Sequence, residues 1–212
     1  MQNPPTIEDA MTFHFGGADA TPGWVVRSSL MALLAHARSE TGRDPYTGEL
    51  ADEEGSGSWL GATAYLILLD QIGKCFKPAN APNPAGPSSV ERALQMWSSR
   101  SRPEVCVLTA LRNSLAHDFA LSNRNNKDSD YQHRFALDRD PTRLVELPAE
   151  RWTGDYQSTK QDTTIVSLRA LGDLVETVVA KVKKEAAAAN IEITLAGGPT
   201  ELIYRYGVLH RA

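Results

Sequence analysis

The sequence is poor in cysteine, and it lacks both a long hydrophobic run and a strong net charge. Its 212 residues include two cysteines, Cys75 and Cys106, which are too few for the disulfide framework of a small secreted protein. Both lie in apolar stretches with helical spacing, so we expect two reduced, buried thiols in a cytoplasmic protein. Residues 1–15 carry no basic segment before an apolar run, so we expect no signal peptide. No apolar stretch approaches the roughly 20 residues of a membrane-spanning helix, so we expect no contact with a membrane.

Composition and charge narrow the class of protein further. The hydrophobic fraction of 42% and the charged fraction of 23% are typical of a globular domain with a substantial core. The net charge of −4 gives no global attraction to nucleic acid, so an RNA site has to come from a local basic patch. The sequence also lacks a Gly-rich phosphate loop, paired zinc-binding cysteines, a His-Glu metal helix and a nucleophile elbow. We therefore expect neither a metal nor a cofactor.

Hydrophobic periodicity predicts a mainly α fold, a helical bundle of four or five helices with small β-hairpin additions. The second helix is strongly apolar and therefore central. In it Asp70 and Lys74 are spaced for a surface ion pair, and a supporting role for Asp70 beside the fourth helix is the alternative. The predicted helices cover residues 23–40, 58–76, 88–99, 103–119 and 163–189.

The flanking segments predict less regular structure. Residues 1–22 are rich in proline and glycine, which indicates a loosely structured N-terminal arm with at most a short helix at Ile7–Phe13. Residues 42–57 form an acidic, Gly/Ser-rich stretch without ligand spacing, so we expect a mobile loop rather than a metal site. Four prolines in residues 78–87 indicate a stiff connector between helices.

Two stretches predict β-structure. Within a helical domain at 23–190, the region near 120–160 is an irregular or β insert. In it, residues 132–137 and 143–147 alternate around the turn at 138–141 and predict a hairpin. Residues 191–212 predict a C-terminal hairpin-like tail around Gly197-Gly198-Pro199.

The helix predicted at 103–119 carries the side chains with the most chemistry. At about 100° per residue, one face is apolar and packs into the bundle. Asn113 and His117 lie one turn apart on another face, with Arg112 at its border. We expect Asn113 to hydrogen-bond the His117 ring and fix its tautomer, while Arg112 offers a fork of donors to a phosphate. The core face consists of Val105, Leu108, Leu111, Leu115 and Phe119, and the second face of Thr109, Asn113 and His117.

The stretch Arg112-Asn113-Ser114-Leu115-Ala116-His117 resembles the motif of the HEPN superfamily. That motif is an arginine, then four to six residues, then a histidine, often with a polar residue directly after the arginine. The resemblance is specific over the motif and architectural over residues 23–190. It implies an α-helical bundle in which Arg112, Asn113 and His117 are the catalytic residues.

The same resemblance implies a metal-independent endoribonuclease that cleaves single-stranded RNA, of the kind found among toxins and antiphage effectors. Two domains pair as a homodimer and share a composite site. His117 then acts as general base or acid on the ribose 2′-OH, and Arg112 holds the scissile phosphate. The products carry a 2′,3′-cyclic phosphate and a 5′-OH. An antitoxin or another regulatory protein is a further implied partner.

Local charge around the motif fits a phosphate-binding surface. The segment from Arg92 to Lys127 contains six basic residues against two acidic ones, although the whole chain is acidic. We expect RNA contacts from four of these basic residues, and the alternative is that they are ordinary solvated charges. The four are Arg100, Arg102, Arg124 and Lys127.

Other interpretations of the motif remain open. A protonated His117 near the end of a helix is favoured by the helix dipole, and Arg112 can be a structural ion-pair partner. Some HEPN domains do no chemistry. The alternative function is therefore a non-catalytic HEPN-type module that binds RNA, a nucleotide or a protein partner.

Overall fold

The computed structural model describes most of the chain and shows a mainly α-helical fold with small β-sheets. The described residues are 4–16, 19–21, 24–51, 58–82, 88–125, 127–138, 143–158 and 161–211. Over these residues the α-helices are α1 (Ile7–Phe15), α2 (Ser29–Glu40), α3 (Trp59–Cys75), α4 (Ser89–Trp97), α5 (Arg102–Asn113), α6 (Leu168–Ala187) and α7 (Gly198–Tyr206). The strands are β1 (Asp19–Thr21), β2 (Trp24–Ser28), β3 (Phe76–Pro78), β4 (Ser122–Asn123), β5 (His133–Asp138), β6 (Val145–Glu146), β7 (Thr163–Ser167), β8 (Ile191–Ile193) and β9 (Gly207–Arg211).

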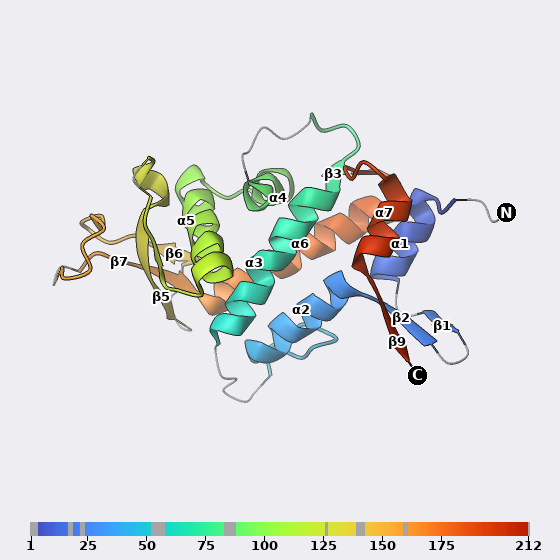
Figure 1. The fold of residues 1–212 in the computed structure, drawn as a ribbon, viewed down its shortest axis with the longest axis horizontal. Helices are drawn as coiled ribbons and strands as arrows, with labels where there is room; N and C mark the ends of the chain where they lie inside the picture. Colours follow the sequence, from blue (N-terminus) through green and yellow to red (C-terminus); the bar gives the residue numbers. More distant parts are fainter. Residues whose placement is uncertain are drawn as a thin grey trace.

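Helix α3 is the centre of the bundle (Figure 1). It packs against α2, α4, α5 and α6, and its side chains Tyr65, Leu66 and Leu69 are fully buried. A helix that is apolar on most sides has to be enclosed by others, as its sequence predicted. The five expected helices correspond to α2 to α6, so the mainly α prediction is confirmed. None of the described helices is long and apolar enough to cross a membrane.

Two of the predicted helices begin later than expected, because a strand precedes each of them. Residues 24–28 form β2 and residues 163–167 form β7. Each strand ends at a serine whose hydroxyl caps the following helix: Ser28 accepts the N–H of Met31, and Ser167 accepts that of Ala170. A serine with extended backbone is a preferred N-cap, so the helices begin there.

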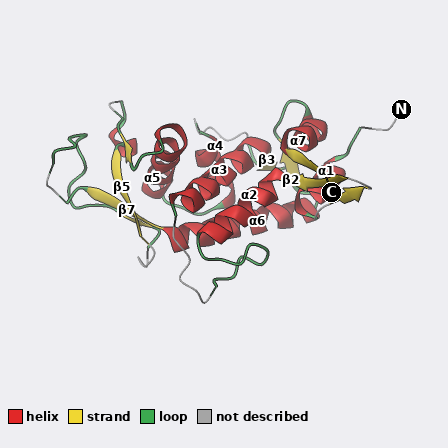
Figure 2. Cartoon of the chain, turned by 60° about the horizontal axis from the view of Figure 1, so that its bottom comes forward, coloured by secondary structure: helices red, strands yellow, loops and turns green. Residues whose placement is uncertain are grey.

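The hairpin predicted in the insert is wrong. The sheet has the order β4-β5-β7-β6, so β7 lies between the two expected hairpin strands. Strand β5 pairs in parallel with β7, and β6 pairs antiparallel with β7. Residues 139–142, which include most of the predicted turn, lie outside the described residues. This sheet lies beside α5, on the side away from α3 (Figure 2).

The two terminal segments have different outcomes. The short helix predicted at Ile7–Phe13 is present as α1, which extends to Phe15, has a capping box between Thr6 and Asp9 and buries Ala10 and His14 against the fold. The C-terminal hairpin is not formed, because β8 pairs with β3 and β9 pairs with β2. Helix α7 occupies the stretch between them, with Pro199 in its first turn, a position where proline costs no hydrogen bond.

The two predicted connectors are only partly described. In the acidic loop, Arg43 is buried, and its guanidinium forms an ion pair of 2.7 Å with Asp173 of α6. That contact holds the first part of the loop to the bundle. The remainder of the loop, residues 52–57, and residues 83–87 of the proline-rich connector lie outside the described residues.

Candidate active site

The motif lies where α5 changes its geometry. The α-helix ends at Asn113, and a single π-helical turn follows over Ser114–Asp118. The buried Ser114 holds this turn, since its hydroxyl lies 2.5 Å from the carbonyl oxygen of Ala120 and 3.0 Å from that of Ser122. The prediction of a continuous α-helix to residue 119 is therefore wrong over its last turn. Single π-helical turns inside helices are frequent at functional sites.

The three predicted catalytic side chains meet at this turn, through Arg112. Its Nη1 donates to Oδ1 of Asn113 over 3.2 Å and lies 3.3 Å from Nε2 of His117. A guanidinium can only donate, so Nε2 of His117 accepts in this arrangement and the ring proton is on Nδ1. Among the described side chains, no hydrogen bond joins Asn113 directly to His117. The prediction that these residues meet is confirmed, but the predicted contact is replaced by the arginine.

A carboxylate from α3 fixes the other side of the guanidinium. Nη2 of Arg112 lies 3.2 Å from Oδ2 of Asp70, and the two side chains are 23% and 16% exposed. The predicted partner of Asp70 was Lys74, so the ion pair predicted within α3 is replaced by one between helices. Asp70 is the one acidic residue of α3, and a single carboxylate in so apolar a helix is the signal that points to a specific partner.

The motif lies partly in solvent, whereas the middle of α5, residues 105–111, is buried. His117 is exposed, and Leu111 and Leu115 are buried as predicted. Thr109, which was expected on the face of His117, is buried as well. Phe119 is 53% exposed rather than packed in the core, because the π-helical turn rotates the residues that follow it away from the α-helical positions.

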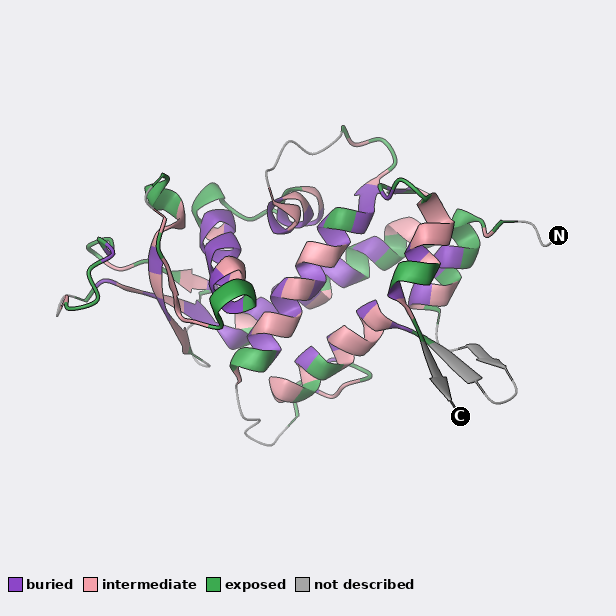
Figure 3. Cartoon of the chain, viewed as in Figure 1, coloured by how far each residue is buried: buried purple, intermediate pink, exposed green. Residues whose placement is uncertain are grey.

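Phe119 instead contacts an aromatic side chain from the start of α3. Its ring centroid lies 6.0 Å from that of Trp59, at an interplanar angle of 50°. Trp59 is 40% exposed. Figure 3 shows the exposed turns at the neighbouring ends of α3 and α5. No spacing or motif in the sequence connects Trp59 with Arg112, Asn113 and His117.

The structure does not bring Arg100 and Arg102 to the motif. Arg100 pairs with Glu104 over 3.4 Å. Arg102 donates to the hydroxyl of Tyr131 over 3.0 Å, and its guanidinium lies 5.8 Å from the centre of that ring. Arg102 begins α5, about 15 Å from Arg112 at 1.5 Å per residue, and Arg100 precedes the helix. Neither takes part in the contacts of Arg112, and their predicted contact with RNA stays a prediction.

Arg124 and Lys127 lie on the loop that follows β4. Both are exposed. Within the described part of the chain, neither forms an ion pair or a hydrogen bond with Arg112, Asn113 or His117. Their predicted contact with RNA therefore stays a prediction.

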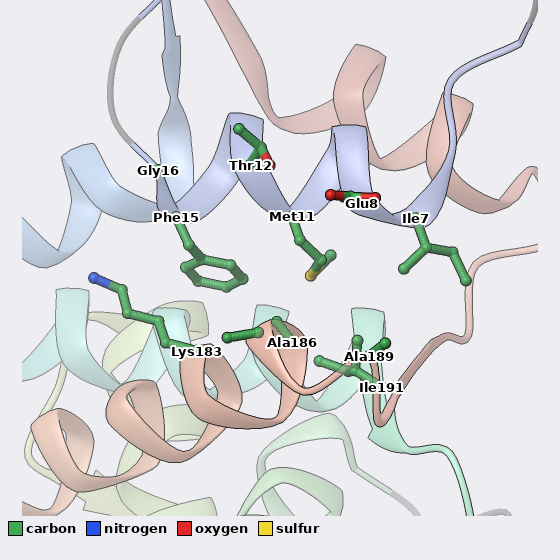
Figure 4. Close-up of a pocket in the computed structure, with 11 residues that line it drawn as sticks. Ile7, Glu8, Met11, Thr12, Phe15, Gly16, Lys183, Ala186, Ala189 and Ile191 are labelled. Carbon is green, nitrogen blue, oxygen red and sulfur yellow. The ribbon is translucent and has the colours of Figure 1, made fainter.

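The enclosed cavities lie away from the motif. A cavity of about 570 Å³ lies between α1 and the C-terminal end of α6, where the alanines of α6 leave space beneath the apolar face of α1 (Figure 4). A second cavity, of about 250 Å³, lies between the start of α5 and the insert. None of the motif side chains lines either cavity. The first is lined by Ile7, Met11, Phe15, Lys183, Ala186 and Ile191 among others, the second by Arg102, Cys106, His133 and Trp152 among others.

Within the described part of the chain, neither cysteine forms a hydrogen bond with Arg112, Asn113 or His117. Cys75 and Cys106 are buried and unpaired, as predicted, and burial raises the pKa of the Cys75 thiol to about 11. Among the described residues, no group of three or more His, Cys, Asp or Glu is arranged to hold a metal ion.

Comparisons of the chain with protein-family models, with curated proteins and with solved structures found no match. The geometry of the residues is therefore the basis for any functional conclusion.

Proposed function

We propose that this chain is a metal-independent endoribonuclease of the HEPN type, which cleaves single-stranded RNA by attack of a ribose 2′-OH. The contact between Arg112 and His117 on an exposed turn supports the proposal most directly. It combines a permanent cation suited to phosphate with an imidazole that can accept or donate a proton. Cleavage by an internal nucleophile requires that combination, because charge develops on the phosphate as a proton leaves the 2′-OH.

The proposed reaction begins when a phosphate takes the place of His117 beside Nη1 of Arg112. Nε2 of His117 is then free to accept the proton of the 2′-OH. The 2′ oxygen attacks phosphorus, the bond from phosphorus to the 5′ oxygen breaks, and Arg112 stabilises the charge on the non-bridging oxygens. The departing 5′ oxygen takes a proton from a separate acid. The products are a 2′,3′-cyclic phosphate and a 5′-OH.

A second copy of the motif is the proposed source of that acid. Each chain presents one His117, and acid and base are both needed in the same step. We therefore propose a homodimer in which two motifs face each other and form one composite site. Cytoplasmic RNA as target, a role as toxin or antiphage effector, and control by an antitoxin or another protein belong to the same proposal.

Asp70 and Asn113 are the proposed positioning residues. Asp70 holds Nη2 of Arg112, and Asn113 accepts from Nη1, so the guanidinium is directed before substrate arrives. An arginine that is already oriented loses less freedom when it binds phosphate. The contact of Arg112 with His117 is weaker than its contact with Asp70, because the first does not join two opposite charges in this arrangement.

The test is cleavage of single-stranded RNA by the purified chain in the presence of EDTA. We expect fragments that end in a cyclic phosphate, and we expect His117→Ala and Arg112→Ala to reduce the rate by about 10²- to 10⁴-fold. His36→Ala is the matched control, because His36 is exposed on α2. No cleavage of RNAs of varied sequence, or full activity in both motif variants with the fold retained, would overturn the proposal.

One observation favours the alternative of a non-catalytic binding module. The charge of Arg112 is already balanced by Asp70, which weakens its attraction for an anion. A wild-type chain that binds single-stranded RNA but leaves it intact would establish that alternative.

A further inference from the structure

Two large aromatic side chains stand partly in solvent beside the motif. Trp59 begins α3 and Phe119 follows the π-helical turn, and their rings contact each other across the two helices. They are 40% and 53% exposed. A phenylalanine or a tryptophan that only serves packing is normally far more enclosed, because its ring contributes most when it leaves water.

The backbone of Phe119 makes core packing an insufficient explanation. It has φ of 50° and ψ of 41°, in the left-handed region, where glycine is unstrained and a bulky residue is rare. A glycine would end the π-helical turn at lower cost. The chain instead carries a ring there, and that ring faces solvent and Trp59.

The aromatic pair and the motif lie along one seam between α3 and α5. Asp70 of α3 contacts Arg112 at one point of the seam, and Trp59 of the same helix contacts Phe119 at the other. The Cα atoms of His117 and Phe119 are at most about 7 Å apart, since a single residue, Asp118, lies between them along the chain. The imidazole of the motif and a flat aromatic surface are therefore close enough to contact neighbouring parts of one RNA strand.

We propose that Trp59 and Phe119 form a stacking platform for the base of a nucleotide next to the scissile phosphate. This inference rests on the proposed function. It identifies the side chains that select single-stranded RNA as the substrate. A nucleotide presents an anionic phosphate and a flat base, and the seam offers Arg112 to the first and an aromatic ring to the second. Because every base has a flat face, the platform holds an unpaired base without reading its identity. Bases of a duplex are already stacked on one another, so duplex RNA is excluded.

The experiment measures RNA binding in the full-length His117→Ala protein, which cannot complete the reaction. Fluorescence anisotropy of a labelled single-stranded RNA gives the dissociation constant at fixed salt. Phe119→Gly removes the ring and suits the left-handed backbone, so the fold is retained. We expect it to weaken binding by about 5- to 100-fold, and Trp59→Ala to act in the same direction.

Three controls sharpen the result. The His117→Ala protein is the parent of every variant in this experiment. Trp59→Phe keeps an aromatic ring and is expected to bind RNA within about twofold of the parent. The same is expected of Tyr204→Ala, which removes a ring that is 83% exposed on α7. A single-stranded RNA with an abasic position beside the scissile phosphate is expected to bind the parent protein as weakly as the intact RNA binds Phe119→Gly.

The outcomes separate this inference from the proposed function. If the parent protein binds no RNA, the proposed function fails and the platform with it. If it binds RNA while Phe119→Gly and Trp59→Ala bind equally well, the platform is overturned and the proposed function stands. If the two variants change sedimentation from dimer to monomer and leave the RNA affinity unchanged, the aromatic surface is a contact between copies of the chain, which also overturns the platform.

Discussion

At the scale of single residues, Arg112 is the side chain on which the site depends. Its guanidinium contacts a carboxylate, an amide and an imidazole at once. Of these contacts, the one to Asp70 is charge-assisted and partly shielded from water, so it is the strongest. In the proposed reaction, a phosphate therefore displaces His117 from Arg112 while Asp70 keeps the arginine in place.

The first prediction concerns Asp70. We expect Asp70→Ala to lower kcat/KM about 10- to 100-fold, because Arg112 loses the group that directs it, and to lower the free energy of unfolding by about 1–3 kcal/mol. Asp70→Asn retains an acceptor, so its effects should be smaller. RNA cleavage rates and urea unfolding measure the two quantities. The control is Asp173→Ala, which removes the partner of Arg43 on a different face of the fold. Faster cleavage by Asp70→Ala would show that Asp70 restrains Arg112 instead of positioning it.

A second prediction concerns His14, which is buried between α1, β2 and α7. Its ring contacts the hydroxyl of Ser28 and the carbonyl oxygen of Leu202, and burial lowers its pKa to about 4. The unfolded chain, in which the pKa of histidine is about 6.5, then binds more protons between pH 6.5 and pH 4. Stability falls as pH falls through this window, by about 3 kcal/mol in all.

Urea unfolding at pH 7 and at pH 4 checks the prediction for His14. His14→Asn, which does not titrate there, should lose much less stability between the two pH values than the parent protein. His36→Asn, at an exposed position, should keep the parental slope. Equal slopes for the parent and His14→Asn would contradict the assignment.

Contacts between residues were predictable where the residues lie close together in the sequence. Arg112, Asn113 and His117 lie within one and a half turns of each other, so the sequence was enough to bring them together. Asp70 and Trp59 reach the motif through the packing of α3 on α5, which depends on the whole bundle. Their partners could not be read from the chain, although an isolated acid in an apolar helix gave a hint for Asp70.

At the scale of elements, the existence of the helices was predictable and their ends were not. Periodicity identifies an apolar face, but a strand that leads directly into a helix continues the same apolar run, as β2 leads into α2 and β7 into α6. The decisive local signals were Ser28 and Ser167, whose capping bonds begin the helices. The π-helical turn after Asn113 has no comparable signal, because it depends on the contacts of Ser114.

The third prediction concerns that turn. Ser114→Ala removes the donor to two carbonyl groups, so we expect a loss of about 1–3 kcal/mol in the free energy of unfolding. We also expect slower RNA cleavage, since His117 lies in the turn that Ser114 holds. Chemical unfolding and cleavage rates are the measurements. Ser98→Ala is the control, because Ser98 makes a similar bond to the carbonyl oxygen of Leu94 at the end of α4. It should lose stability and keep its cleavage rate; equal rates for both variants would separate the turn from catalysis.

At the scale of the whole molecule, the proposed composite site requires two chains. The fourth prediction is that His117→Ala suppresses the activity of the wild-type chain. A mixed dimer of the two proteins has one His117, so its composite site lacks either the base or the acid. With the wild-type concentration held constant and RNA in excess, we expect the cleavage rate to fall severalfold when an excess of His117→Ala is added and the subunits are allowed to exchange.

Sedimentation of the wild-type chain and of His117→Ala has to show dimers for the mixing experiment to be informative. A cleavage rate that stays unchanged after subunit exchange would mean that each chain works without the His117 of the second chain. A wild-type chain that cleaves RNA while it sediments as a monomer would exclude the composite site altogether.

Long-range pairing was the part of the fold that the sequence did not predict. The two apparent hairpins assumed that neighbouring strands pair with each other. Instead β5 pairs in parallel with β7, and β8 and β9 pair with strands from much earlier in the chain. Which strands pair depends on which strand edges remain free after the helices have packed. No local sequence pattern predicts this.

The pairing of β2 with β9 has a consequence during synthesis of the protein on the ribosome. Ser28 pairs with Gly207, so one edge of β2 has no partner until residues 207–211 have left the ribosome. At about 5–20 residues per second, that delay is on the order of ten seconds or more. During it, β2 presents unpaired amide and carbonyl groups to any other nascent strand. Rapid translation or a chaperone that holds this edge would therefore raise the yield of native protein, while β1, its early partner on the other edge, shields only half of the strand.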